Sequence, residues 1–317
     1  QALIIKNKGA TGVSAYSTTL ASIYDSFVRI VEETDPRIPR AHYNLAETLF
    51  TIKDFDQATE HYRWVVDHGK WNAAPVKVKG QTAKELAAKA GNGDASVQDA
   101  SLKAIAARYE VLRQKNMIPK ELTARALSKQ STDKADPFLM QWVEWIDTHL
   151  SHTSQGTENF VFEANRSLYA QGQLEVAIAR MSNFAEKNPR STFAIPSASL
   201  VLDTYIESQD WEKTHDLANE LMEIKDWESG AGAGESKNAF GKKLYAVASD
   251  AFYKQLEAKF RARDFKGTLK GCDQFLKRYG ASTRLADTLA LAGTAALEDI
   301  DKKRASSYFS RLIAEAP

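Results

Sequence analysis

The sequence repeats one short pattern of residue types several times along its length. Each copy has an apolar residue followed by alanine or glycine, a short polar break, an aromatic residue or leucine, and then an alanine and a further large apolar residue. The best copies begin at Tyr43, Leu168, Tyr205 and Leu289. Repetition with a period of about 34 to 40 residues is typical of helix pairs stacked as a solenoid. The sequence therefore favours a curved binding surface over a reaction centre.

Helical periodicity dominates the chain, and no stretch alternates as a strand does. Apolar residues from Tyr16 to Val31 recur in steps of three and four, and this pattern predicts a helix that ends before Asp35-Pro36. We expect an all-α fold, an α-α superhelix of stacked hairpins with a helical insertion. The repeats are predicted to start near Pro39, Glu158, Ile195, Ser249 and Ala286.

Two segments interrupt the repeat and set the predicted domain boundaries. Residues 1–72 are expected to hold N-terminal hairpins, 73–157 an inserted or degenerate helical module, and 158–317 a C-terminal array. Within 73–157 we expect helices near 95–115, 120–130 and 137–151. A glycine-rich joint at 230–234 interrupts the last array. The chain begins with glutamine and with what reads as the second helix of a pair, so we interpret it as a mature form or an excised fragment.

The charge balance argues against nucleic acid as a partner. The chain has 42 basic and 41 acidic residues among 317, with the two signs evenly spread. Neutralising phosphates needs a basic excess that neither half has. No apolar run approaches the length of a membrane-spanning helix, so no integral membrane segment is expected. The single cysteine, Cys272, excludes an internal disulfide and is interpreted as a buried apolar residue.

Sequence signatures of catalysis, of metal binding and of cofactor binding are poor. His149 and His152 share a helical face, but no cysteine or carboxylate is spaced to complete a zinc site. His42, His61, His68 and His215 are interpreted as packing or surface residues. The glycines at 230–234 lack the Gly-Lys-Ser/Thr of a phosphate loop. We therefore predict no catalytic residue, no metal and no cofactor, and expect a protein that is not an enzyme.

These motifs resemble the tetratricopeptide repeat family. The segment from Glu158 to Pro189 matches best, with Leu168, Gly172, Leu174 and Ala177 at family positions. The resemblance implies a solenoid, and it implies little about function, because this fold hosts many roles. The joints Asn188–Ala194 and Tyr279–Ala286 are similar to joints in bacterial envelope repeat proteins. That similarity implies a periplasmic or envelope-associated protein, with the cytoplasm as the alternative.

The same resemblance implies a groove lined by the first helix of each pair. Aromatic side chains beside single charges suit a peptide groove, because rings bury area at a low entropy cost and charges fix orientation. The alternative is that these residues close the superhelix. The candidate partner-binding residues are Tyr43, Asn44, Glu47, Phe50, Phe162, Glu163, Arg166, Tyr169, Ser199, Asp203 and Ile206.

A second candidate surface is the helix from Phe138 to Leu150. Its apolar residues, which include Trp142 and Trp145, cover more than one face. A helix of this kind is buried or lies at an interface. Core packing is the first interpretation, and a tryptophan patch that contacts a partner is the alternative.

The sequence thus predicts a non-catalytic scaffold that binds a partner protein or peptide, in a bacterial envelope complex. Two alternatives stay open at this point. The first alternative is that the chain is the non-catalytic superhelical part of a larger enzyme. The second is that it is a structural oligomer that associates through the Trp142 and Trp145 helix.

Overall fold

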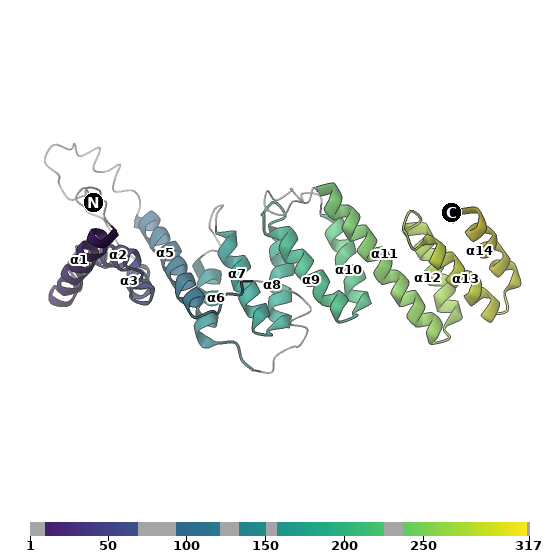
Figure 1. The fold of residues 1–317 in the computed structure, drawn as a ribbon, viewed down its shortest axis with the longest axis horizontal. Helices are drawn as coiled ribbons and strands as arrows, with labels where there is room; N and C mark the ends of the chain where they lie inside the picture. Colours follow the sequence, from purple (N-terminus) through teal and green to yellow (C-terminus); the bar gives the residue numbers. More distant parts are fainter. Residues whose placement is uncertain (1–9, 69–92, 121–132, 150–156, 225–236, 316–317) are drawn as a thin grey trace. The chain divides into compact units, whose positions relative to one another are not determined.

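The computed structural model describes residues 10–68, 93–120, 133–149, 157–224 and 237–315, and all the regular structure in these ranges is helical. Consecutive helices pack against each other within each of two compact units (Figure 1). The all-α class and the solenoid arrangement of helix hairpins are thereby confirmed. The predicted helix near 120–130 and the glycine joint at 230–234 lie outside the described residues.

The contacts group the helices into two compact units that divide between α7 and α8. The predicted boundaries after residues 72 and 157 stay predictions. The first unit consists of α1 (Ala10–Ile30), α2 (Ile38–Thr51), α3 (Phe55–Asp67), α5 (Gly93–Gln114), α6 (Pro137–His149) and α7 (Glu158–Ala170). The second consists of α8 (Leu174–Lys187), α9 (Ala194–Glu207), α10 (Trp211–Glu223), α11 (Lys237–Arg261), α12 (Phe265–Arg278), α13 (Leu285–Glu298) and α14 (Lys302–Glu315).

Helix starts agree with four of the five predicted repeat starts. Helices α2, α7, α9 and α13 each begin within one residue of the position expected from the sequence. The start predicted near Ser249 is wrong, because Ser249 lies inside the 25-residue helix α11. The reason is that α11 extends the repeat helix toward its N-terminus, so the repeat pattern begins in mid-helix.

Small side chains occupy the positions where helices come closest. In the first unit Ala46, Ala58 and Ala104 are fully buried and share one core with Leu45 and Tyr62. In the second unit Gly293 lies against the ring of Phe309, and a Cβ built on this glycine would lie 2.6 Å from the ring. The close approach of paired helices therefore depends on alanine and glycine, as the repeat pattern predicts.

Four of the breaks between paired helices share one backbone geometry. Lys53, Gln209, Arg263 and Ile300 all have positive φ, between 56° and 67°. The aspartate that follows each of them accepts a hydrogen bond from the backbone N–H three residues later. This N-cap satisfies one of the amide groups that a helix start leaves unpaired. The polar break of the sequence pattern therefore consists of a residue in the left-handed backbone conformation, followed by an aspartate that caps the next helix.

We expect Arg263→Gly to stabilise the second unit. Arg263 is exposed and has a φ of 60°, a region that costs a side-chain-bearing residue more than glycine. The free energy of unfolding should rise by about 0.5–1 kcal/mol, as measured by urea denaturation. The matched control is Lys266→Gly, at an exposed position within α12, which should lower it by about 1 kcal/mol. Equal losses in both variants would contradict the prediction.

Candidate functional site

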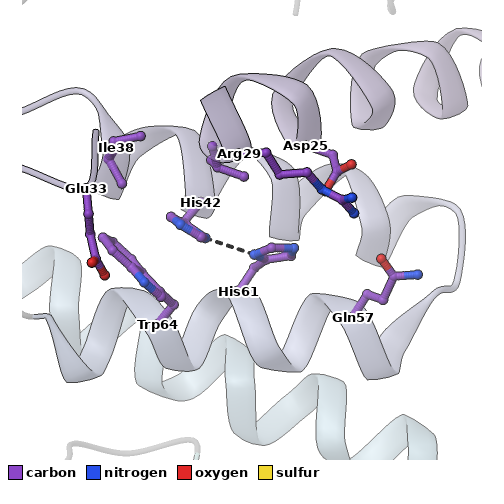
Figure 2. Close-up of a pocket in the computed structure, with 9 residues that line it drawn as sticks. Asp25, Arg29, Glu33, Ile38, His42, Gln57, His61 and Trp64 are labelled. Atoms are coloured by element: carbon purple, nitrogen blue, oxygen red, sulfur yellow. Dashed lines mark hydrogen bonds and ion pairs between the residues drawn. The ribbon is translucent and has the colours of Figure 1, made fainter. Parts of the chain in front are cut away.

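A cavity of about 450 Å³ lies between α1, α2 and α3 (Figure 2). We refer to it as the α1–α3 cavity. All of its lining residues belong to the first unit. They are Asp25, Val28, Arg29, Glu33, Ile38, His42, Gln57, His61 and Trp64.

Two histidines face each other across the cavity. His42 on α2 and His61 on α3 have their Nδ1 atoms 2.8 Å apart, so one of these nitrogens donates a hydrogen bond to the other (Figure 2). Burial, together with the charges of His61 and His68, lowers the pKa of His42 to about 4. Burial also lowers the pKa of His61, although Asp25 and Glu60 oppose this effect. Both imidazoles are therefore neutral at pH 7, as a shared Nδ1–H···Nδ1 bond requires.

Trp64 forms a rigid wall of the cavity because two imidazoles stack on it. Its ring lies 3.9 Å from that of His42 and 4.2 Å from that of His68, and both pairs are nearly parallel. His68 is fixed in turn, because its Nδ1 is 2.8 Å from the carbonyl of Trp64 and its Nε2 is 3.4 Å from Glu33. The flat aromatic surface thus keeps one orientation without a ligand.

The rest of the cavity combines apolar and charged groups. Val28 and Ile38 contribute aliphatic surface. Asp25 and Arg29 form an ion pair of 3.0 Å on α1, and Gln57 donates its amide to Asp54 at 2.8 Å. No lining residue is a serine, threonine, cysteine or lysine. A lining that combines aromatic rings, aliphatic groups and paired charges is suited to binding a ligand.

Two of the predicted groove residues meet in a polar network. Tyr43 and Glu47 on α2 contact Lys103 on α5, and Lys103 Nζ lies 2.7 Å from Glu47. The Tyr43 hydroxyl donates to Asp99, and the Tyr62 hydroxyl donates to Glu47. Burial raises the pKa of Tyr43 to about 12. These groups therefore connect α2, α3 and α5 to each other, and their role toward a partner stays a prediction.

The other groove candidates also make contacts within the chain. Asn44 donates to the hydroxyl of Tyr24 at 3.4 Å, and Phe50 packs edge-on against Phe55. Arg166 forms an ion pair of 2.9 Å with Glu163 and lies over the ring of Phe162. In the second unit, loss of hydration raises the pKa of Asp203. Ser199 and Ile206 are both partly buried. The role of these residues toward a partner stays a prediction.

The structure corrects two residues proposed to face a partner. Tyr169 is 0% exposed and Trp142 is 1% exposed, so both belong to the core. Trp142 on α6 donates its indole N–H to the carbonyl of Ile105 on α5 at 3.0 Å. Both are large apolar residues at helix positions that pack inward, which confirms the first interpretation of the Trp142 helix. Trp145 is partly buried, and the guanidinium of Arg63 lies 4.9 Å from its ring.

Sequence reasoning missed the histidine pair. His42 and His61 were interpreted as packing or surface residues, and the structure shows them lining a cavity together. A usable signal was present, because the two histidines lie on the two paired helices of the same copy. Paired helices bring such positions together. Cys272 is buried as predicted, and burial raises the pKa of its thiol to about 12.

Within the described ranges, no group of three or more histidine, cysteine, aspartate or glutamate residues is arranged to hold a metal ion. None of the helices in these ranges combines the length and the apolarity that crossing a membrane requires.

Neither a protein-family model nor a curated protein matches this chain. Among solved structures, one described as "Computational Design of Self-Assembling Cyclic Protein Homooligomers" matches at 14% identity with a TM-score of 0.11. That match covers 97% of this chain and 86% of the other. A TM-score this low carries no argument about fold or function.

Proposed function

We propose that this protein is a non-catalytic interaction scaffold, and that its first unit binds a segment of a partner protein in the α1–α3 cavity. The observation that carries the proposal is the cavity itself. Its volume of about 450 Å³ accommodates a large side chain of a partner, and its rigid Trp64 wall is formed in advance. Rigid aromatic surface beside paired charges is what partner-anchoring pockets commonly present.

The chemistry of the cavity supports binding over catalysis. A general base that works at neutral pH has a pKa near 7, whereas burial holds that of His42 at about 4. The paired Nδ1 atoms are occupied with each other, and the acid and base of Asp25 and Arg29 form an ion pair. Positioned donors, acceptors and a ring remain, and these select a ligand by shape and polarity.

Membership of the tetratricopeptide repeat family is part of the proposal. It is supported by the packing of alanines and Gly293 between helices and by the capped hairpin breaks. The proposed periplasmic or envelope location rests on the resemblance of two joints alone, and the cytoplasm is its alternative. Partners of this class are proteins or peptides, and self-association is one form of such binding.

Selection of peptides tests the proposal. A random peptide display library is selected on the immobilised protein, and the affinity of each enriched peptide is measured by titration. Gln57→Trp places a large ring at the exposed edge of the cavity, so it should weaken binding at least about tenfold by steric exclusion.

The matched control is Gln98→Trp, which adds the same ring at an exposed position on α5 outside the cavity. It should leave affinity unchanged, and the helical circular dichroism signal should be the same in both variants. Enriched peptides that bind Gln57→Trp as well as the parent protein would overturn the assignment of the cavity.

A further inference from the structure

A second and much smaller pocket lies between α3, α5 and α6, and two arginines line it. Its volume is about 10 Å³, which is room for about one water-sized group. We refer to it as the arginine pocket, and none of its residues lines the α1–α3 cavity. Its lining residues are Thr59, Arg63, Arg108, Gln141, Trp142 and Trp145.

Arg108 is a cation that the fold buries without a close counter-charge. It is 7% exposed, and it donates a hydrogen bond to Gln141 Oε1 at 2.8 Å. The nearest carboxylate, Asp56, lies 3.9 Å away and is itself 62% exposed. Burial lowers the pKa of Arg108 to about 10, although Asp56 and Glu60 act in the opposite direction. The loss of hydration is therefore larger than the compensation from these two carboxylates.

Arg63 adds a buried donor that lacks an acceptor. Its Nε is buried, and no atom in the described part of the chain accepts a hydrogen bond from it. Its ion pair with Glu60 is long, at 3.8 Å, and the Glu60 side chain is 66% exposed. The ring of Trp145 lies 4.9 Å from the guanidinium, which offers only a weak acceptor. A buried polar atom of this kind normally has a partner.

Cations and carboxylates both surround the pocket, and they differ in how exposed they are. Arg63 and Arg108 repel each other, and Lys115 lies with Arg108 over the nearby ring of Phe138. The opposing carboxylates are Asp56 and Glu60 on α3, with Asp136 at a longer range. Asp56 and Glu60 are largely in water, where their field is screened, whereas Arg108 is buried and Arg63 is partly buried beside two tryptophan rings.

We propose that the arginine pocket binds a carboxylate group, with one oxygen accepting from Arg63 Nε and with Arg108 supplying the second positive charge. The tryptophan rings contact the apolar carbon beside that group. A small free carboxylic acid and an aspartate or glutamate side chain of a protein both present this chemistry. The small volume admits about one oxygen atom, so the other oxygen of the carboxylate stays at the opening of the pocket. The inference goes beyond the proposed function, because it concerns a different site and holds whether or not the cavity binds a partner.

The first arm of the test uses acetate. Acetate replaces chloride at constant ionic strength, while tryptophan fluorescence and the melting temperature of the protein are recorded. We expect a saturable fluorescence change with a rise in melting temperature, because a ligand of the folded state stabilises it. Arg63→Gln should weaken the apparent affinity about tenfold or more, since it removes a charged donor from a partly exposed residue.

Two further variants separate a binding site from a general loss of structure. Asp56→Asn and Glu60→Gln remove the competing carboxylates at exposed positions, so each should tighten acetate binding. The matched control is Arg113→Gln, an exposed arginine of α5 outside the pocket, which should leave the affinity unchanged. Unfolding would not strengthen acetate binding in the two acid variants while weakening it in Arg63→Gln.

The second arm distinguishes the sources of the carboxylate. A short peptide with one central aspartate is compared with the same peptide carrying asparagine, both with blocked ends. Tighter binding of the aspartate peptide than of acetate indicates a protein ligand, and the reverse indicates a small acid. No saturable response to acetate or to the aspartate peptide would overturn the proposal. A response to chloride or phosphate that acetate does not compete with would also overturn it.

Discussion

Replacing Trp142 by alanine should lower the free energy of unfolding by about 3–5 kcal/mol, the largest loss that we expect from a single substitution in this chain. The side chain is 1% exposed and packs from α6 against α5. Its removal leaves a cavity and also leaves the carbonyl of Ile105 without the indole donor. Urea denaturation measures the loss, and hydrogen exchange of α5 and α6 should show faster exchange there.

Two controls assign the effect to burial. Trp142→Phe keeps most of the packing and removes the hydrogen bond, so it should cost about 1–2 kcal/mol. Trp145→Ala removes a ring that is only partly buried and should cost less than Trp142→Ala. An alanine variant of Trp142 that unfolds at the same urea concentration as the parent would contradict the core position of this residue.

Lowering the pH from 7 to 5 should destabilise the first unit through the His42 and His61 pair. The pKa of His42 is about 4 in the folded protein and near 6.5 in the unfolded chain. Between these two values the unfolded chain binds a proton that the folded chain does not. The stabilisation is therefore complete above pH 6.5 and is lost as the pH falls toward 4. At 1.36 kcal/mol for each pKa unit, His42 contributes at most about 3 kcal/mol over that range.

The pH dependence has a matched variant. His42→Phe keeps a ring against Trp64 and removes the titrating group, so its unfolding free energy should change less between pH 7 and pH 5 than that of the parent. Urea denaturation at a series of pH values measures the difference. His61 contributes in the same direction, because burial lowers its pKa too. Parallel pH curves for the parent and His42→Phe would show that folding does not lower the pKa of His42.

Local features of the fold follow closely from the sequence. The helix starts at Ile38, Glu158, Ala194 and Leu285 were predicted within one residue, because the copies align on the small residue of their second helix. The start at Ser249 was missed because nothing in the local pattern marks how far α11 extends toward its N-terminus. The buried alanines were predicted from their repeat positions, since only small side chains allow paired helices to approach closely.

Both sites depend on helix rotation, which the sequence pattern does not specify. Arg63 and Trp64 are neighbours in the chain, yet Trp64 lines the α1–α3 cavity and Arg63 lines the arginine pocket. An α-helix has 3.6 residues per turn, so adjacent side chains point about 100° apart. Which neighbour each of them meets depends on how α3 packs between α2 and α5.

The sequence by itself determined the helical class, most helix starts, the small residues of the core and the burial of Cys272, because these depend on local propensity and on a repeated spacing. The tertiary structure alone decided that His42 meets His61, that Tyr43 and Glu47 share Lys103, and that Arg63 and Arg108 come together. Each of these sets joins side chains from different helices, and their distances arise only when the helices pack.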